Sequence, residues 1–342
     1  MNVKIRRLIP ERHTEWDSFV EKHPKATFFH KVGWKGAVER AFGHAMPYLF
    51  AEDEEEIVGI LPLGHIRSRL FGNALISNPF CVYGGAVADQ EDIREKLEEY
   101  AVQLAHESAV DYLELRNCTR GRISRPVKSL YVTFRKELDP EVERNLAAVP
   151  RKQRAMIRKG FSNGLVSVLD SGVDRFFMAY SESVRNLGTP VFPKRFFLCL
   201  KEIFGKDCEI LTVEYQGRVV SSVMNFYFRN EVLPYYGGGT AEARDLKAND
   251  FMYWEVMRRA VERGVRIFDY GRSKEGTGSY HFKTHWGFEP EPLPYEYELV
   301  KAKAMPDINP LNPKFRFFVA AWKRLPLPVS RIVGPWISRN LG

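Results

Sequence analysis

Side chains that could perform chemistry gather in one part of the second half of the chain. Asp269 is a single acid in an apolar run, and Arg272 follows it after a glycine. His281 and His285 stand four residues apart, a spacing that on a helix would put two imidazoles on one face, as in zinc sites. No third ligand has a matching spacing, so we expect no metal site. The segment 271–276 looks like a phosphate loop but lacks the Lys-Ser/Thr that follows one, which argues against an NTPase.

The elements that must position these side chains occur twice along the chain. Each half is predicted to contain two strands, a strand ending in Tyr-Gly-Gly, an amphipathic helix and a short strand with one acid. In the first half these segments are 48–51, 57–63, a strand ending at 81–85, 93–104 and 112–115. In the second half they are 209–215, 219–228, a strand ending at 235–239, 250–263 and 267–270. Glu114 and Asp269 fall at matching places.

This repeated order describes the GNAT type of N-acyltransferase fold. The sequence therefore predicts an α+β protein of two tandem GNAT-type modules, with mixed, mostly antiparallel sheets flanked by helices. The 342 residues suit two modules of roughly 150 residues each. The predicted segments are a structural first module at 1–127, a second module with the transferase site at 128–300, and a basic aromatic tail at 301–342.

Several motifs together resemble the FemAB family, tandem GNAT-fold proteins that transfer amino acids from aminoacyl-tRNA to peptidoglycan precursors. The branch that looks most similar is the FemAB-like one associated with exosortase/PEP-CTERM systems in Gram-negative bacteria. The resemblance covers nearly the whole chain. The motifs are Phe268–Ser273 with Gly278–Gly287, the basic run Val149–Gly160, Gly188–Pro193, and the tail from Asn312 to Pro328.

The resemblance implies that Phe282 and Lys283 lie at the acyl-transfer centre, with the lysine assisting the reaction. Attack of an amine on an ester or thioester builds an oxyanion, which a fixed ammonium in a desolvated cleft stabilises. Backbone N–H groups at Gly237 and Gly238 would supply further donors, since glycine allows close backbone approach. The alternative is that Lys283 is a surface lysine and the glycines only fit a bulge.

The attacking amine must also lose a proton, and Asp269 is the best sequence candidate for the base. The alternative is a structural carboxylate paired with Arg272 or Lys274. We count Arg272 among the substrate-binding candidates.

FemAB-like proteins bind acceptor phosphates with an arginine and tyrosines near the 188–193 motif. Arg185 matches the arginine, whose guanidinium can bind a phosphate through two hydrogen bonds. The tyrosine expected one turn later is replaced by Thr189 in this sequence. Tyr235 and Tyr236 are further candidates for the acceptor wall, or ordinary core tyrosines.

The segment 241–250, where CoA-dependent GNAT enzymes cradle a pyrophosphate, contains no glycine. This argues against ordinary CoA binding there. The run 144–160 has six basic residues and no acid, with Arg154 and Arg158 as candidate donor contacts. Its partner could be tRNA phosphates, an anionic glycan or lipid-linked acceptor, or only solvent. We expect no tightly bound cofactor, and either aminoacyl-tRNA or acyl-CoA/acyl-ACP as the donor.

The net charge of +8 is unevenly distributed, because residues 301–342 carry eight basic side chains and one acid. The segment 314–324 is also aromatic, so it could lie in a membrane interface with Trp322 at headgroup depth, or pack as a terminal helix on the second module. The N-terminus lacks the apolar region of a secretory signal, and no long apolar stretch occurs. Four cysteines without CxxC spacing suit a reducing compartment. We expect a cytoplasmic protein with peripheral membrane contact through 312–342.

The sequence thus predicts an acyl or aminoacyl transferase acting on an amine of a cell-envelope or exopolysaccharide-related acceptor, by direct transfer. Two alternatives stay open. One is an acyl-CoA or acyl-ACP N-acyltransferase acting on an amino sugar or peptide. The other is a non-catalytic GNAT repeat that serves as an envelope-assembly scaffold.

Overall fold

The computed structural model describes residues 3–68, 72–306 and 313–342, and the chain forms two compact units. Unit 1 comprises Met1–Tyr131, Pro292–Asp307 and Arg339–Gly342, and unit 2 comprises Val132–Glu291 and Ile308–Ser338. This division differs from the expected segments 1–127, 128–300 and 301–342. Strand β17 (Tyr295–Leu299) pairs with strands of unit 1, so the chain after residue 291 returns to the first unit.

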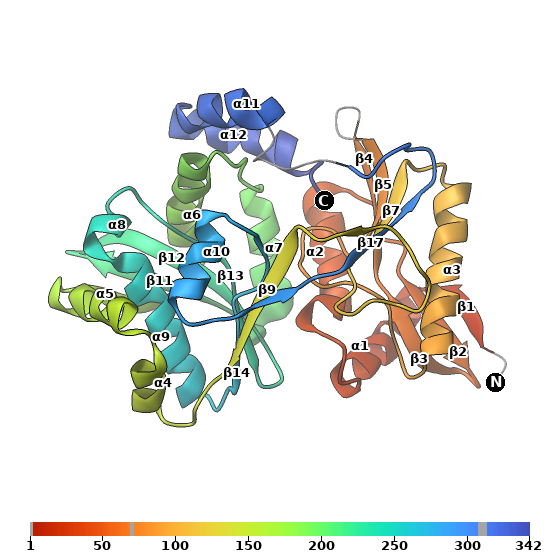
Figure 1. The fold of residues 1–342 in the computed structure, drawn as a ribbon, viewed down its shortest axis with the longest axis horizontal. Coiled ribbons are helices and arrows are strands. Elements are labelled where there is room, and N and C mark those ends of the chain that lie inside the picture. Colours follow the sequence, from red (N-terminus) through yellow and green to blue (C-terminus); the bar gives the residue numbers. More distant parts are fainter. Residues whose placement is uncertain (1–2, 69–71, 307–312) are drawn as a thin grey trace. The chain divides into compact units, whose positions relative to one another are not determined.

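Unit 1 contains two sheets, in the orders β1-β2-β3-β6 and β4-β5-β7-β17-β8, with helices α1 to α3 (Figure 1). Helix α3 covers one core, with Ile93, Leu97, Ala101 and Leu104 on its buried face as the helical spacing predicts. The strands are β1 (Lys4–Arg7), β2 (Leu49–Asp53), β3 (Glu56–Leu61), β4 (Leu63–Ser68), β5 (Gly72–Ser77), β6 (Val87–Ala88), β7 (Tyr112–Leu115), β8 (Val127–Lys128) and β17. The helices are α1 (His13–Lys22), α2 (Val32–Phe42) and α3 (Glu91–Glu107).

The predicted strand at the first Tyr-Gly-Gly motif is wrong. Cys81 to Gly85 is irregular, and Asn78 and Phe80 just before it have φ of 48° and 65°. The buried Arg116 guanidinium donates to the carbonyls of Asn78 (3.3 Å) and Cys81 (2.7 Å). Polar backbone groups that a strand would have paired are therefore satisfied by a side chain.

Unit 2 has one eight-stranded sheet among the described residues, in the order β10-β11-β12-β13-β14-β9-β15, with β16 beside β9. Its strands are β9 (Tyr131–Glu137), β10 (Val166–Asp170), β11 (Cys208–Tyr215), β12 (Arg218–Phe228), β13 (Glu231–Gly239), β14 (Ile267–Asp269), β15 (Ser273–Lys274) and β16 (Pro290–Pro292). Its helices are α4 (Val142–Ala148), α5 (Arg151–Ser162), α6 (Asp174–Leu187), α7 (Lys194–Phe204), α8 (Ala243–Leu246), α9 (Ala248–Glu262), α10 (Gly278–His285), α11 (Pro313–Lys323) and α12 (Leu327–Ser338).

Most predicted elements of unit 2 are confirmed. Helix α6 ends at Leu187, because Gly188 at φ 85° takes the left-handed conformation that glycine favours. Helix α4 begins at Val142, two residues after Pro140.

The repeat is visible in the strand order of each unit. In unit 1, β4-β5-β7-β17 runs antiparallel, parallel, antiparallel, and in unit 2 β12-β13-β14-β9 does the same. The connection between the parallel strands contains α3 in unit 1, and α8 and α9 in unit 2. The matching acids occupy matching strands: Glu114 is buried on β7 and Asp269 on β14.

Candidate functional site

Strands β13 and β14 of unit 2 diverge after a short parallel pairing. They pair only at Glu231↔Ile267 and Val232↔Phe268, while β13 continues through Leu233–Gly239 beside β12. The register with β12 also shifts between Met224 and Asn225, which places a bulge at Tyr235. The divergence lies at the C-terminal end of a parallel pair, where α/β sheets commonly bind ligands.

Lys283 reaches the end of β14 from helix α10. The helix is capped by Thr277, whose hydroxyl accepts the N–H of Tyr280, and it turns Lys283 into the protein. The side-chain Nζ donates to the carbonyls of Gly271 (2.9 Å) and Arg272 (3.1 Å). The residue is only 8% exposed. The alternative of a surface lysine is therefore wrong.

Burial sets the protonation of Lys283. Desolvation lowers its pKa from 10.5 to about 7, the Asp269 carboxylate partly opposes this, and the Arg272 charge adds to it. Its nitrogen also lies 5.3 Å from the ring centre of Phe134 and 5.9 Å from that of Tyr270. Two aromatic faces thus stabilise the ammonium where water does not. A lysine with this pKa exchanges its proton near neutrality.

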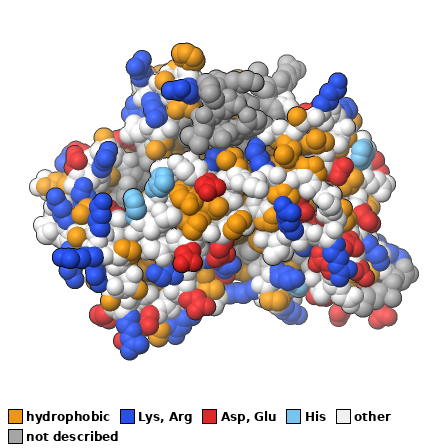
Figure 2. All heavy atoms as spheres, in the orientation of Figure 1, with side chains coloured by type: hydrophobic (Ala, Val, Ile, Leu, Met, Phe, Trp, Pro, Cys, Tyr) orange, Lys and Arg blue, Asp and Glu red, His pale blue; other side chains and the backbone are white. Residues whose placement is uncertain are grey.

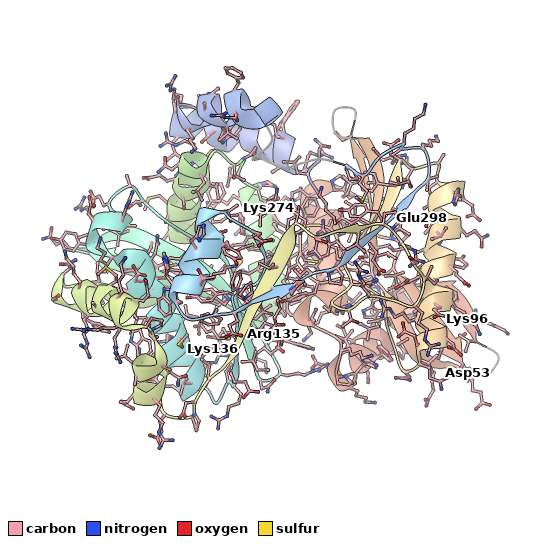
Figure 3. All side chains as sticks on the ribbon, viewed as in Figure 1. Asp53, Lys96, Arg135, Lys136, Lys274 and Glu298 are labelled. Atoms are coloured by element: carbon pink, nitrogen blue, oxygen red, sulfur yellow. The ribbon has the colours of Figure 1, made fainter. Side chains whose placement is uncertain are left out.

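Asp269 is tied to the same turn. Its Oδ1 accepts the N–H of Gly271 at 2.6 Å, and its Oδ2 lies 3.5 Å from the Nε of Arg135 on β9, which Figure 3 labels. Gly271 has φ of 63°, so the turn needs a residue that tolerates this conformation. The carboxylate and Lys283 hold opposite sides of one peptide turn, and this geometry favours positioning over proton abstraction for Asp269.

The predicted aromatic and glycine residues of β13 divide between two faces. The Tyr235 ring faces Gly271, with 3.6 Å between a ring carbon and the position of a Cβ on that glycine. Tyr236 is buried among aromatic rings of α6 and α7, including Tyr180 and Phe197. Tyr235 thus lies beside the Lys283 turn, and Tyr236 is in the core.

Gly237 and Gly238 are places of close approach. A Cβ on Gly238 would lie 2.4 Å from the Ser183 Cβ on α6, and one on Gly237 would lie 3.0 Å from the Tyr253 hydroxyl on α9. Real Cβ atoms do not approach neighbours at 2.4 Å, so Gly238 lets α6 pack directly on β13.

The remaining predicted residues lie on other elements. Arg185 on α6 donates from Nη1 to the carbonyls of Lys323 and Leu325, both at 3.3 Å, and so binds the C-terminal end of α11. Arg154 on α5 donates to the Ala147 carbonyl at 3.0 Å, and Arg158 is exposed on the same helix. The structure therefore brings together Lys283, Phe282, Asp269, Arg272 and Tyr235, and not these three arginines.

Sequence reasoning missed two residues of the site. Phe134 on β9 lies under the Lys283 ammonium, and Tyr253 on α9 contacts Phe282 with ring centres 5.5 Å apart. Burial raises the pKa of Tyr253 to about 12, so its hydroxyl keeps its proton. Alternation marks Phe134 as inward-facing, but only the fold brings it to Lys283.

No group of three His, Cys, Asp or Glu side chains able to hold a metal occurs in residues 3–68, 72–306 and 313–342. Among the same residues, no helix is long and apolar enough to cross a bilayer. Of the four cysteines, Cys118 is exposed and the other three are buried.

Residues 149–284 match the family model described as "Acetyltransferase (GNAT) domain", a range that includes β13, β14 and Lys283. The matched range lies within unit 2 and makes that unit similar to a GNAT-type acetyltransferase domain. The expected fold, a mixed α+β GNAT-like arrangement in two modules, is confirmed, and so is the expectation of an acyltransferase. Among curated proteins, none matches this sequence.

Solved structures show the same fold at low sequence identity. FemX superposes with a TM-score of 0.67 at 13% identity, covering 87% of this chain and 98% of that one. The C-terminal domain of a candidate lysylphosphatidylglycerol synthetase from Agrobacterium fabrum gives a TM-score of 0.57 at 13% identity, covering 85% and 92%. A tandem GNAT protein from the clavulanic acid biosynthesis pathway gives a TM-score of 0.55 at 12% identity. The match covers 89% of this chain and 100% of that one. These likenesses establish the fold across both units.

Proposed function

We propose that this protein transfers an activated acyl or aminoacyl group to an amine of a cell-envelope or exopolysaccharide-related acceptor. The acceptor amine attacks the donor carbonyl, and the carbonyl oxygen becomes an oxyanion. The oxyanion then collapses to the amide, the donor's ester or thioester bond breaks, and the proton lost by the amine ends on the leaving hydroxyl or thiol. No covalent bond to the protein forms.

The buried ammonium of Lys283 carries this proposal. An ammonium has three N–H donors, and two of them serve the carbonyls of Gly271 and Arg272. The third can donate to the oxyanion. Phe282 packs behind it against Tyr253 and Trp286, and so fixes α10. Because the backbone carbonyls hold the nitrogen in place before reaction, stabilising the oxyanion requires little reorganisation.

The basic face of α5 supports a polyanionic donor, and we propose aminoacyl-tRNA. Figure 2 shows Lys and Arg side chains gathered over the part of unit 2 where α5 lies in Figure 1. Four of them are exposed and form no ion pair within the described residues: Arg151, Lys152, Arg158 and Lys159. Helix α5 also reaches the glycine-free segment, where Asn163 donates to the Leu246 carbonyl at 3.0 Å. A phosphate backbone needs such a cationic surface, and it needs no glycine loop.

The acceptor assignment rests on the FemAB-like motifs, whose resemblance to the exosortase/PEP-CTERM branch suggests a cell-envelope or exopolysaccharide acceptor. We therefore propose that the protein works at the inner face of the cytoplasmic membrane. Arg185 would contact acceptor phosphates only after releasing the end of α11.

Labelled aminoacyl-tRNA, acyl-CoA and acyl-ACP, each with an amine acceptor, test the reaction. We expect transfer from aminoacyl-tRNA, and we expect Lys283→Met to lower kcat by about 10²–10³. Lys201→Met is the matched control, because Lys201 on α7 also donates to a backbone carbonyl, that of Cys208 at 2.6 Å.

Transfer from acyl-CoA alone would replace the proposed donor and keep the site. Wild-type turnover by Lys283→Met would remove Lys283 from the mechanism. If no donor is used and none raises the melting temperature, the scaffold alternative holds.

A further inference from the structure

Helix α12 exposes large apolar side chains to solvent, whereas an ordinary surface helix buries them. Its buried face consists of small residues, Ser330, Gly334 and Ser338. Its outer face is a continuous apolar stripe at positions i, i+3, i+4 and i+7. The stripe consists of Val329 (40% exposed), Ile332 (72%), Val333 (40%) and Trp336 (79%). An outward stripe of large apolar residues is the signature of a surface that meets another apolar phase.

The neighbouring helix α11 extends this apolar surface and adds charge. Phe317 is 88% exposed, and Phe318 stacks on Trp322 with ring centres 5.4 Å apart. Trp322 itself is buried, so the expectation that it lies at headgroup depth is wrong, and Trp336 is the exposed tryptophan. Residue 312 and the side chains of 313–315 lie outside the described residues.

Basic side chains border the stripe without acidic neighbours in the sequence. Arg316, Lys323 and Arg324 are exposed, and residues 313–338 contain no Asp or Glu. Figure 2 shows basic and apolar side chains side by side over these helices.

Helices α11 and α12 pack against the rest of unit 2, and hydrogen bonds to α6 and to the segment after it hold them there. Besides the Arg185 bonds to the end of α11, the Nε of Arg331 donates to the Ser181 hydroxyl at 2.9 Å. The Ser338 hydroxyl donates to the Val191 carbonyl at 3.0 Å. A Cβ on Gly334 would lie 2.9 Å from the Val191 nitrogen, so the small residues let α12 pack closely. The apolar stripe is therefore preformed.

We propose that α11 and α12 form a membrane-docking surface for an anionic lipid bilayer. In this arrangement the helices lie in the plane of the interface, Ile332, Trp336 and Phe317 enter the acyl boundary, and the basic residues contact lipid phosphates. The charge favours a bilayer over an apolar protein partner, because the stripe has a cationic border and no acidic residue. The proposal is independent of the transfer reaction.

Vesicle pelleting of the full chain tests the docking. We expect binding to vesicles of phosphatidylcholine with about a third phosphatidylglycerol, and at least about tenfold weaker binding to phosphatidylcholine alone. The double variant Ile332→Ser with Trp336→Ser should lose about tenfold or more in affinity for the anionic vesicles. The control Leu198→Ser removes an equally apolar side chain, 48% exposed on α7, and should bind like wild type.

Tryptophan fluorescence gives a second readout specific to the stripe. Of the six tryptophans, Trp16, Trp34, Trp254, Trp286 and Trp322 are buried, so an aqueous quencher acts mainly on Trp336. Anionic vesicles should shift the emission to the blue and protect it from the quencher. Trp336→Phe should abolish the fluorescence change while pelleting persists.

Three results would overturn the proposal. They are no pelleting of the wild type, equal pelleting of the double variant at an unchanged melting temperature, and a lipid-free dimer that the double variant dissociates. The last would assign the stripe to a second copy of the chain.

Discussion

Units 1 and 2 share one strand order but end their parallel strand pair differently. In unit 1, β5 ends at Ser77, one residue past its last pairing with β7 at Ile76. In unit 2, β13 continues to Gly239, although its last pairing with β14 is at Val232. The strands therefore stay together in one unit and separate in the other.

Side-chain hydrogen bonds hold the end of the parallel pair in unit 1. The N–H of Arg116 donates to the Ser77 hydroxyl at 2.6 Å, and its guanidinium pairs with Glu114 at 2.8 Å. Tyr297 of β17 donates to the same carboxylate at 3.0 Å. Unit 2 instead has the turn at Gly271, helix α10 and Lys283. The same topology gives an end held by the Arg116–Glu114 pair in unit 1 and a buried lysine bonded to a glycine turn in unit 2.

The largest expected effect tests whether unit 1 is only structural. Arg116→Met leaves Glu114 buried without its cation, so we expect a loss of about 3–5 kcal/mol in the free energy of unfolding. Urea denaturation measures it. Arg122→Met is the control, since the exposed Arg122–Asp92 pair should contribute at most about 1 kcal/mol. If folded Arg116→Met protein lost turnover, unit 1 would be part of the catalytic site.

A smaller effect tests what holds the extended end of β13. Gly238→Ala places a methyl group 2.4 Å from the Ser183 Cβ, so overpacking should cost about 1–3 kcal/mol in the free energy of unfolding. Adding Ser183→Gly should restore much of that loss. A Gly238→Ala variant as stable as wild type would show that α6 does not pack this closely.

A third effect, small per pH unit and cumulative over the titration window, comes from the protonation of Lys283. In the unfolded chain its pKa is 10.5 and in unit 2 about 7, so between these values the unfolded state binds more protons. The free energy of unfolding therefore gains up to about 1.4 kcal/mol per pH unit from this group as pH rises through that window. Below pH 7 the lysine is charged in both states and adds no slope.

Denaturation of wild type and Lys283→Met from pH 6 to 10 isolates this contribution, because every other titrating group is common to both. Parallel curves would mean that Lys283 is solvated. The same pKa predicts that turnover dependent on the Lys283 ammonium declines above about pH 7.

Much of unit 2 could be predicted from the sequence because its signals are local. The glycine after α6, the hairpin at Gln216-Gly217 and the apolar stripes each fix an element within a few residues. The strand predicted at the first Tyr-Gly-Gly motif was wrong because this tripeptide suits either a strand end or a loop. The choice depends on a side chain distant in the sequence, Arg116, which binds the carbonyls of the loop.

The candidate site was predictable only in part. The position of Lys283 in a motif singled it out, whereas its aromatic neighbours Phe134 and Tyr270 come from strands that the sequence does not link to it. The outward orientation of the apolar stripe on α12 could not be predicted from the sequence either. Its small and large residues alternate at helical spacing, and the sequence alone indicates the opposite orientation.

The sequence by itself determined the two-module α+β fold and the order of elements along the second module, since periodicity and glycine placement act over short distances. Tertiary structure alone decided which strand pair separates, how far the pKa of Lys283 falls, and which face of α12 meets solvent. Each of these depends on desolvation and packing between segments far apart in the chain, which residue spacing does not encode.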